Sequence, residues 1–261
     1  SPPADPSTGT NAGVVSVVCS GFAGCEGDDA GICLTSPTSA LDVGSESAGF
    51  LVLGPSNSRF VGTQVSLLGD VYSTTGSEVG VTQQQAAHAI WGRSTYSDVS
   101  LAGASPATVF TSDLGIGATS SRAGSFDGDA DPDWSYCLRL NGSNDPICRI
   151  VRGNEAPDIQ ITGFSDEVPP VHAVTFGGRF NDDDRDDLVF YEPETAWVIL
   201  GTNSGSVIDV SDLGDSGFQL TGDTDAEWSV HGLGDVDKDG FDEIVIADAT
   251  SGTIYVLRGG P

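Results

Sequence analysis

The feature that most constrains this chain is a short acidic loop that recurs at a regular spacing. The last copy, Gly234–Ile246, reads Gly-Asp-Val-Asp-Lys-Asp-Gly-Phe-Asp-Glu-Ile-Val-Ile. Three aspartates alternate with other residues, a glycine follows them, and a glutamate stands just before an apolar run. Alternating carboxylates on a tight turn suit a hard cation, because Ca²⁺ takes several oxygen ligands. The sequence therefore predicts a Ca²⁺ loop here.

Three upstream segments align with this loop without gaps. They begin at Gly69, Gly124 and Gly178, so that successive copies start 54 to 56 residues apart. Each copy is followed by an apolar run that ends in glycine. These runs are Ala89–Gly92, Arg149–Gly153, Val198–Gly201 and Ile254–Gly259. A constant period across the chain indicates a repeat architecture.

The units have the composition of β structure. Short runs of Val, Ile, Thr and aromatic residues alternate with clusters of Gly, Ser, Asp and Asn, and helical periodicity is almost absent. Four short strands can be assigned to a unit. In the last unit they are Gly217–Thr221, Ser229–Leu233, Glu243–Ala247 and Thr253–Leu257. Four-stranded units repeated radially make a β-propeller, so we expect an all-β fold of this kind.

The loop differs from an EF-hand, whose last acid stands at position twelve and precedes a helix. With Asp235 counted as position one, the last acid is Glu243 at position nine, and a strand-like run follows it. The loop resembles that of the FG-GAP, or integrin-α-type, repeat, and Asp212–Gly222 resembles the segment that precedes such loops. The resemblance covers roughly residues 13 to 261. It implies a propeller in which each cation loop joins the innermost strand to the second.

The resemblance also implies the ligands, which are positions one, three, five and nine and the carbonyl of position seven. In the last loop these are Asp235, Asp237, Asp239, the Phe241 carbonyl and Glu243. In the loop that begins at Gly124 they are Asp127, Asp129, the Asp131 carbonyl and Asp133, with Ser125 at position one. In the loop that begins at Gly178 they are Asn181, Asp183, the Arg185 carbonyl and Asp187. Position one of that loop is Arg179, which cannot ligate a cation. We expect two to three Ca²⁺ ions that stabilise their hairpins. The alternative is a set of Asp-rich turns without metal.

The copy at Gly69 keeps acids at its ends, Asp70 and Glu78, but has Tyr72 and Thr74 between them. We expect it to be free of metal.

Residues 1–12 form a polar, Pro-rich tether, and residues 13–261 form one predicted propeller domain with units near 14, 69, 124, 178 and 234. The run Phe50–Gly54 indicates a diverged first unit. We expect five blades, closed by Val14–Val18 pairing beside Thr253–Leu257. Propellers of the family usually have seven blades, so the alternatives are a fragment of a larger ring or a ring completed by a second chain. Without an initiating Met or a signal-peptide pattern, we expect a fragment of a longer precursor.

Two of the five cysteines, Cys137 and Cys148, lie in neighbouring runs joined by a segment that opens with Asn141-Gly142. Two strands that meet at a tight turn bring such positions together, so a disulfide is predicted. Cys19, Cys25 and Cys33 crowd the first unit, where two should pair and one is left over. Their spacing does not match a zinc ribbon, and an oxidising compartment is expected.

The net charge of −28 argues against nucleic acid or an anionic membrane surface as a partner. No apolar run approaches the ~20 residues of a membrane span, so membrane insertion is not expected. Sequence motifs of common hydrolases, metalloproteases and nucleotide-binding enzymes are absent.

We therefore expect a secreted or cell-surface, monomeric, Ca²⁺-stabilised module without catalysis. The resemblance to FG-GAP propellers implies that its role is adhesion or lectin-like recognition of a protein or glycan. The alternatives are a propeller-type polysaccharide lyase or other carbohydrate-active enzyme, and a structural spacer of a larger surface protein. A lyase needs a base beside a cationic residue, and the only lysine, Lys238, lies in a cation loop.

Overall fold

The computed structural model describes residues 14–18, 49–53, 62, 64–72, 77–83, 86–91, 99–101, 115–129, 131–140, 146–153, 157–164 and 173–261. In these residues the protein is all-β, with a single 3₁₀ turn, η1 (Gly214–Ser216). The strands are β1 (Val14–Val18), β2 (Gly49–Leu53), β3 (Val65–Gly69), β4 (Glu78–Gln83), β5 (Ala86–Ile90), β6 (Val99–Ser100), β7 (Gly115–Gly124), β8 (Asp133–Leu140), β9 (Pro146–Val151), β10 (Ile159–Thr162), β11 (Ala173–Gly178), β12 (Asp187–Glu192), β13 (Thr195–Ile199), β14 (Val207–Asp209), β15 (Gly217–Thr221), β16 (Trp228–Gly234), β17 (Glu243–Asp248) and β18 (Thr253–Leu257).

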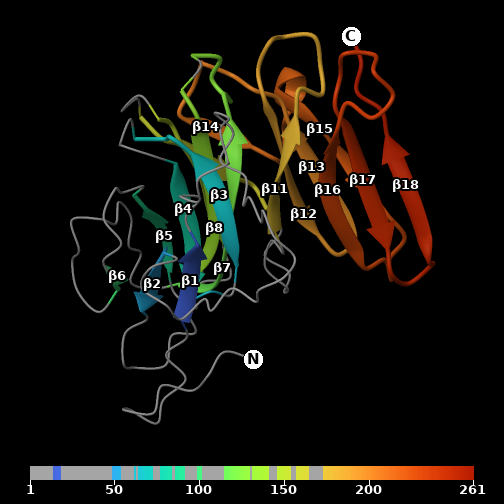
Figure 1. The fold of residues 1–261 in the computed structure, drawn as a ribbon. Helices are drawn as coiled ribbons and strands as arrows, with labels where there is room; N and C mark the ends of the chain where they lie inside the picture. The colour runs from blue at the N-terminus through green and yellow to red at the C-terminus, as the bar shows by residue number, and fades with distance from the viewer. Residues whose placement is uncertain are drawn as a thin grey trace, which may run out of the picture.

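Four successive sheets are arranged like a four-blade β-propeller (Figure 1). They are β3-β4-β5, β7-β8-β9-β10 with β14 beside β10, β11-β12-β13-β15, and β16-β17-β18. The first strand of each sheet contacts the first strand of the next, from β3 through β7 and β11 to β16. The predicted all-β, propeller-like architecture is confirmed at this level.

Each first strand ends at one of the four aligned glycines. Gly69, Gly124, Gly178 and Gly234 have φ values of 92°, 64°, 76° and 72°. The pairing register with the second strand shifts at each of them. Residues with a side chain rarely adopt this left-handed backbone, whereas glycine does so at little cost. The glycine therefore sets the bulge that turns the chain out of the first strand and into the acidic loop.

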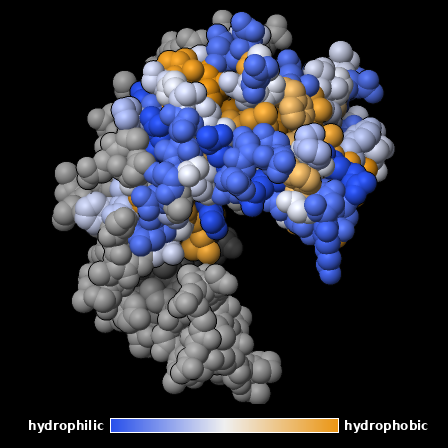
Figure 2. All heavy atoms as spheres, turned by 90° about the horizontal axis from the view of Figure 1, so that it is seen from above, coloured by the Kyte–Doolittle hydropathy of each residue, from blue (hydrophilic) through white to orange (hydrophobic). Residues whose placement is uncertain are grey.

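Apolar clusters fill the interfaces between successive sheets. Trp134 and Tyr136, with ring centroids 5.2 Å apart, pack between the first two sheets. Phe164 meets Trp197 edge-on at 5.3 Å in the next interface. Around these clusters, the described surface seen in Figure 2 is mostly hydrophilic, with hydrophobic groups gathered in a few places. The sheets are therefore held together by side-chain packing across their faces.

The predicted closure of the ring by the N-terminal strand is wrong. Val14–Val18 pairs antiparallel with Gly49–Leu53, and β2 pairs in parallel with β6. Among the described strands, β18 pairs only with β17. β2 is an apolar strand much nearer in the chain than β18, so pairing with it closes a shorter loop. Val52 of β2 then packs on Val81 and Ile90 of the β3–β5 sheet.

The disulfide between Cys137 and Cys148 is confirmed. The two residues face each other across β8 and β9, with Cα atoms 4.1 Å apart. Both side chains are buried in the interface with the β11–β15 sheet. Cys19, Cys25 and Cys33 lie outside the described residues.

Replacing Cys137 and Cys148 together by alanine should lower the free energy of unfolding by about 2–3 kcal/mol, the chain-entropy value for a loop of this size. Urea denaturation of the double variant and the parent would measure the difference. Free thiols at both positions in non-reducing peptide mapping of the parent would contradict the pairing.

Candidate cation loops

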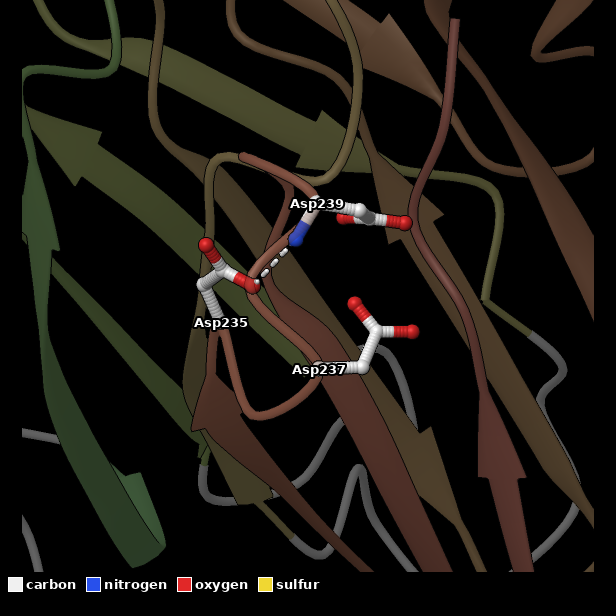
Figure 3. A group of neighbouring side chains, drawn as sticks. All are labelled: Asp235, Asp237 and Asp239. Atoms are coloured by element: carbon white, nitrogen blue, oxygen red, sulfur yellow. Dashed lines mark hydrogen bonds between the residues drawn. The ribbon is translucent and has the colours of Figure 1, made fainter.

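The loop between β16 and β17 brings three aspartates together. Asp235, Asp237 and Asp239 are exposed, and each places a carboxylate oxygen within 4.8 Å of the other two. Figure 3 shows the three side chains around a common space, with the Asp239 amide donating to Asp235. In the described part of the chain, this is the group of acids that comes close enough to share one ion.

Backbone amides of the same loop orient these carboxylates. The amides of Asp239 and Gly240 both donate to Asp235, at 3.1 Å each. In all three acidic loops the amide at position seven also donates to the carboxylate at position five. These bonds are Asp131 to Asp129 at 2.9 Å, Arg185 to Asp183 at 3.0 Å and Phe241 to Asp239 at 3.1 Å. The position-seven residues, whose carbonyls were predicted as ligands, are therefore held by the same hydrogen bond to position five in all three loops.

Position nine has a structural role that the sequence analysis missed. In all four units its buried carboxylate accepts a hydrogen bond from the amide of position two. The pairs are Glu78 with Val71 at 2.6 Å, Asp133 with Phe126 at 2.9 Å, Asp187 with Phe180 at 2.8 Å and Glu243 with Val236 at 2.9 Å. The acid ties the two ends of the loop together even in the unit expected to be free of metal. Glu78, an acid retained where the other ligands are lost, was the sequence signal for this role.

The loops differ in whether the second carboxylate oxygen at position nine has a hydrogen-bond partner. Asp133 and Asp187 accept from the amides of Gly153 and Gly201, at 2.9 and 2.8 Å. In the last loop, Oε1 of Glu243 is buried and has no hydrogen-bond partner. A buried carboxylate oxygen without a partner is costly. A cation beside it would satisfy it, so the residues of this loop fit a bound Ca²⁺.

The two position-nine acids whose oxygens both accept hydrogen bonds have raised pKa values. Burial raises the pKa of Asp133 to about 7 and that of Asp187 to about 7, although the backbone amides oppose the rise. The pKa of Asp127 is also raised, first by burial and then by the nearby Asp129 charge. A nearby divalent cation would act in the opposite direction, because it favours the ionised form.

Arginines supply positive charge to the loops. Arg152 and Arg258 both stand at the end of the third strand of their sheet, immediately before glycine. Arg152 lies 3.9 Å from Asp127, whose side chain is buried, and the Arg152 side chain is only 9% exposed. Arg258 pairs with Asp237 and lies 3.7 Å from Asp239. A guanidinium thus faces the position-three carboxylate in both loops, where it would compete with any metal ion for the same oxygens.

The loop at 181–187 has one feature that favours a bound cation and arginines that oppose one. Oδ1 of Asn181 is buried without a partner, which fits a ligand at position three. Arg185 lies 3.7 Å from Asp183, and Arg179, at position one, pairs with Asp184.

The copy at Gly69 uses position three differently, because the Tyr72 hydroxyl accepts a hydrogen bond of 3.0 Å from Trp134 Nε1. Its Thr74 lies outside the described residues.

Position eight links the loops of neighbouring sheets, which the sequence analysis also missed. The carboxylate of Asp186 accepts from the Ser125 amide of the preceding loop at 2.7 Å. Asp242 accepts from the Arg179 amide in the same way at 2.8 Å. The glycine after the third strand allows the loops to approach, since a Cβ on Gly259 would lie 2.7 Å from the carbonyl oxygens of both Asp242 and Phe180. The loops thus form a connected row rather than independent turns.

The two histidines that the structure describes, His88 and His231, lie on strands outside the acidic loops. His88 is buried on β5, and neither ring nitrogen has a hydrogen-bond partner. His231 is exposed on β16 and lies 3.2 Å from the Ser229 hydroxyl. His172 lies outside the described residues.

No protein-family model and no curated protein matches this chain. In the described residues, no helix is long and apolar enough to cross a membrane. The disulfide is compatible with an extracellular location.

Proposed function

We propose that this protein is a Ca²⁺-stabilised extracellular module that binds a protein or glycan without catalysing a reaction. The observation that carries the cation part is the partnerless, buried Oε1 of Glu243 at a loop whose three aspartates converge. The resemblance of the loops to FG-GAP repeats supports the binding part, because propellers of that family serve in recognition.

In this proposal, Asp235, Asp237, Asp239 and Glu243 hold the ion together with the Phe241 carbonyl. The cation offsets the repulsion among clustered carboxylates, which is otherwise strong at such separations. Because Glu243 begins β17 and Asp235 follows β16, one ion would fix the hairpin between them. One or both of the loops at 127–133 and 181–187 would hold a further ion.

We also propose that the β1-β2-β6 sheet belongs to a fifth blade. β6 pairs in parallel with β2 as β14 pairs in parallel with β10, the fourth strand of its sheet. β1 and β2 would then be the third and fourth strands of the first blade.

Ca²⁺ should raise the melting temperature. At 100 times its dissociation constant, an ion that binds only the folded state stabilises it by about 2.7 kcal/mol. For a chain of this size that corresponds to about 5–10 °C. Differential scanning fluorimetry in Ca²⁺ and in chelator would measure the shift, and Asp239→Ala should reduce it. An identical melting curve under both conditions would refute the cation proposal.

Arg258→Ala should tighten Ca²⁺ binding, because it removes the charge that competes at Asp237. Arg258 is largely exposed, and such ion pairs contribute only about 0.2–1 kcal/mol, so we expect about a two- to fivefold lower dissociation constant by titration calorimetry. Arg149→Ala, which removes the same charge far from this loop, is the control. An unchanged constant in Arg258→Ala would mean that the guanidinium does not compete.

The recognition role needs its own test. Arrays of glycans and extracellular matrix proteins should be probed with the intact chain in Ca²⁺ and in chelator. Saturable binding to one ligand class that weakens in chelator would support the proposal. The absence of any specific binding in Ca²⁺ would favour a spacer role.

A further inference from the structure

β10 and β2 are each flanked on their outer edge by a short strand that runs parallel to them. β14 lies beside β10, and the Val210 amide that follows it donates to the Thr162 carbonyl at 2.8 Å. β6 lies beside β2 in the same way, and the Leu101 amide donates to the Leu53 carbonyl at 2.9 Å. One arrangement of a covered strand edge therefore occurs twice in this chain.

β15, the fourth strand of the β11–β15 sheet, pairs only with β13 among the described strands. Its sequence repeats the pattern of β10, because Phe218-Gln-Leu-Thr221 corresponds to Ile159-Gln-Ile-Thr162. The two apolar residues of β10 are fully buried, whereas those of β15 are only partly buried. β15 thus presents the same kinds of residue as β10 without the strand that covers them.

The backbone of β15 has hydrogen-bonding groups on its outer edge. The Gly222 amide donates to the Glu194 carbonyl, and such bonds alternate along an antiparallel pair. The Gln219 amide and the Thr221 carbonyl therefore point away from β13. The corresponding groups of β10 bond to the segment that contains β14, and these bonds are Gln160 amide to Ser206 carbonyl and Val210 amide to Thr162 carbonyl, at 2.8 Å each.

A groove of about 480 Å³ lies between β15 and β18. β15 lines it with Leu220 and Thr221, and β18 lines it with Tyr255 and Leu257. In the preceding interface, the residues at the places of Leu220, Tyr255 and Leu257 pack in one cluster with Ile208 and Val210; they are Ile161, Trp197 and Ile199. Trp197 is 5% exposed, whereas Tyr255 is 50% exposed. The groove therefore lies where β14 covers the preceding interface.

One end of the groove is acidic, in contrast to the preceding interface. Phe164, two residues after β10, packs in the same cluster as Val210. The chain has Asp223 at the corresponding place after β15, and Asp248 also lines the groove. The Glu227 amide, four residues after Asp223, donates to Asp248 at 3.4 Å, which places both acids at one end. A basic residue is therefore complementary at the place that Val210 takes beside β10.

We propose that the outer edge of β15 binds an extended segment of another protein as a parallel strand. The segment has an apolar residue and, two positions later, Lys or Arg. Residues two apart in a strand point to the same face, so the apolar side chain enters the groove beside Leu220 and the basic one points towards Asp223 and Asp248. Backbone pairing supplies affinity, and these two side chains supply specificity. This partner rests on the proposed recognition role but not on Ca²⁺ binding, because none of the proposed cation ligands lines the groove.

The test is fluorescence polarisation with the intact chain and a labelled Gly-Ser-Val-Ile-Ser-Lys-Ser peptide. The peptide copies residues 205–211, with Ser in place of Asp209, as in β6, and Lys in place of Val210. We expect saturable binding in chelator and in Ca²⁺. A peptide with Glu in place of this Lys should bind about tenfold more weakly. Asp223→Asn should reduce that difference, whereas Asp212→Asn, which removes an exposed acid that does not line the groove, should leave it unchanged.

Two methylated peptides test the strand pairing without altering the protein. N-methylation of the Lys removes the amide that corresponds to that of Val210, so binding should weaken about tenfold. N-methylation of the preceding Ser should have little effect, because its amide points away from β15.

Equal binding of the two methylated peptides would overturn the proposal, as would no binding of the unmodified peptide. In the second case, binding on the glycan and matrix-protein arrays would still support the recognition role, so the two failures can be told apart. Self-association of the intact chain that the peptide disrupts would also overturn the proposal, by making a second copy the occupant.

Discussion

Replacing Asp187 by alanine should lower the free energy of unfolding by about 3–5 kcal/mol, even in chelator. The carboxylate is fully buried and accepts from the Phe180 and Gly201 amides, at 2.8 Å each. Both amides would be left buried without an acceptor, and each such group costs about 1–3 kcal/mol. Denaturant unfolding in chelator would measure the loss without any contribution from metal.

Asp183→Ala is the matched control, because it lies in the same loop at position five. Asp183 is only partly buried and accepts from the Arg185 amide at 3.0 Å. Its replacement should cost less than about 1 kcal/mol in chelator but should reduce any stabilisation by Ca²⁺. Equal losses for the two variants in chelator would contradict the structural role assigned to position nine.

The fold was predictable because its signal is repeated. The period of the loops, the glycine before each loop and the alternating apolar runs are all local in the sequence, and each has one physical meaning in β structure. The Cys137–Cys148 pair was predictable for the same reason, since both residues belong to one hairpin. Such inferences need no knowledge of contacts between distant segments.

The errors concern edges and distant partners. The expected pairing of β1 with β18 does not occur, because a strand edge does not specify its partner and the apolar β2 run lies nearer in the chain. The link from Asp242 to the Arg179 amide crosses between two repeats, so the alignment of single loops could not reveal it. The role of Arg258 depends on how the end of the third strand folds over the loop.

The acidic loops therefore combine two functions that the sequence alone does not separate. Position nine is a structural acceptor in the four loops that the structure describes, with or without a set of possible metal ligands around it. Positions one, three and five converge most closely in the last loop, where Oε1 of Glu243 lacks a partner. In the proposed function, cation binding would be a property added to a hairpin that position nine already holds, and the copy at Gly69 keeps that hydrogen bond without the acids at positions three and five.

Acid should destabilise the protein through His88, and His88→Leu should remove that part of the effect. Burial lowers the pKa of His88 to about 4 from an ordinary value of 6.5. Below pH 6.5 the unfolded chain takes up a proton that folded His88 refuses until about pH 4. The contribution of His88 to stability is therefore fully present above pH 6.5 and is lost as the pH falls towards 4, by about 3 kcal/mol.

Asp133 and Asp187 titrate in the same range with the opposite sign, because their raised pKa values favour the folded state on acidification. The measurement is therefore the difference in unfolding free energy between the parent and His88→Leu, at pH 7 and pH 4.5, in chelator. At pH 7 the leucine should cost little, since neither ring nitrogen has a partner to lose and Val81, directly opposite on β4, is apolar. At pH 4.5 the variant should be the more stable protein by about 2–3 kcal/mol. A difference that does not change with pH would show that His88 is accessible to protons in the folded state.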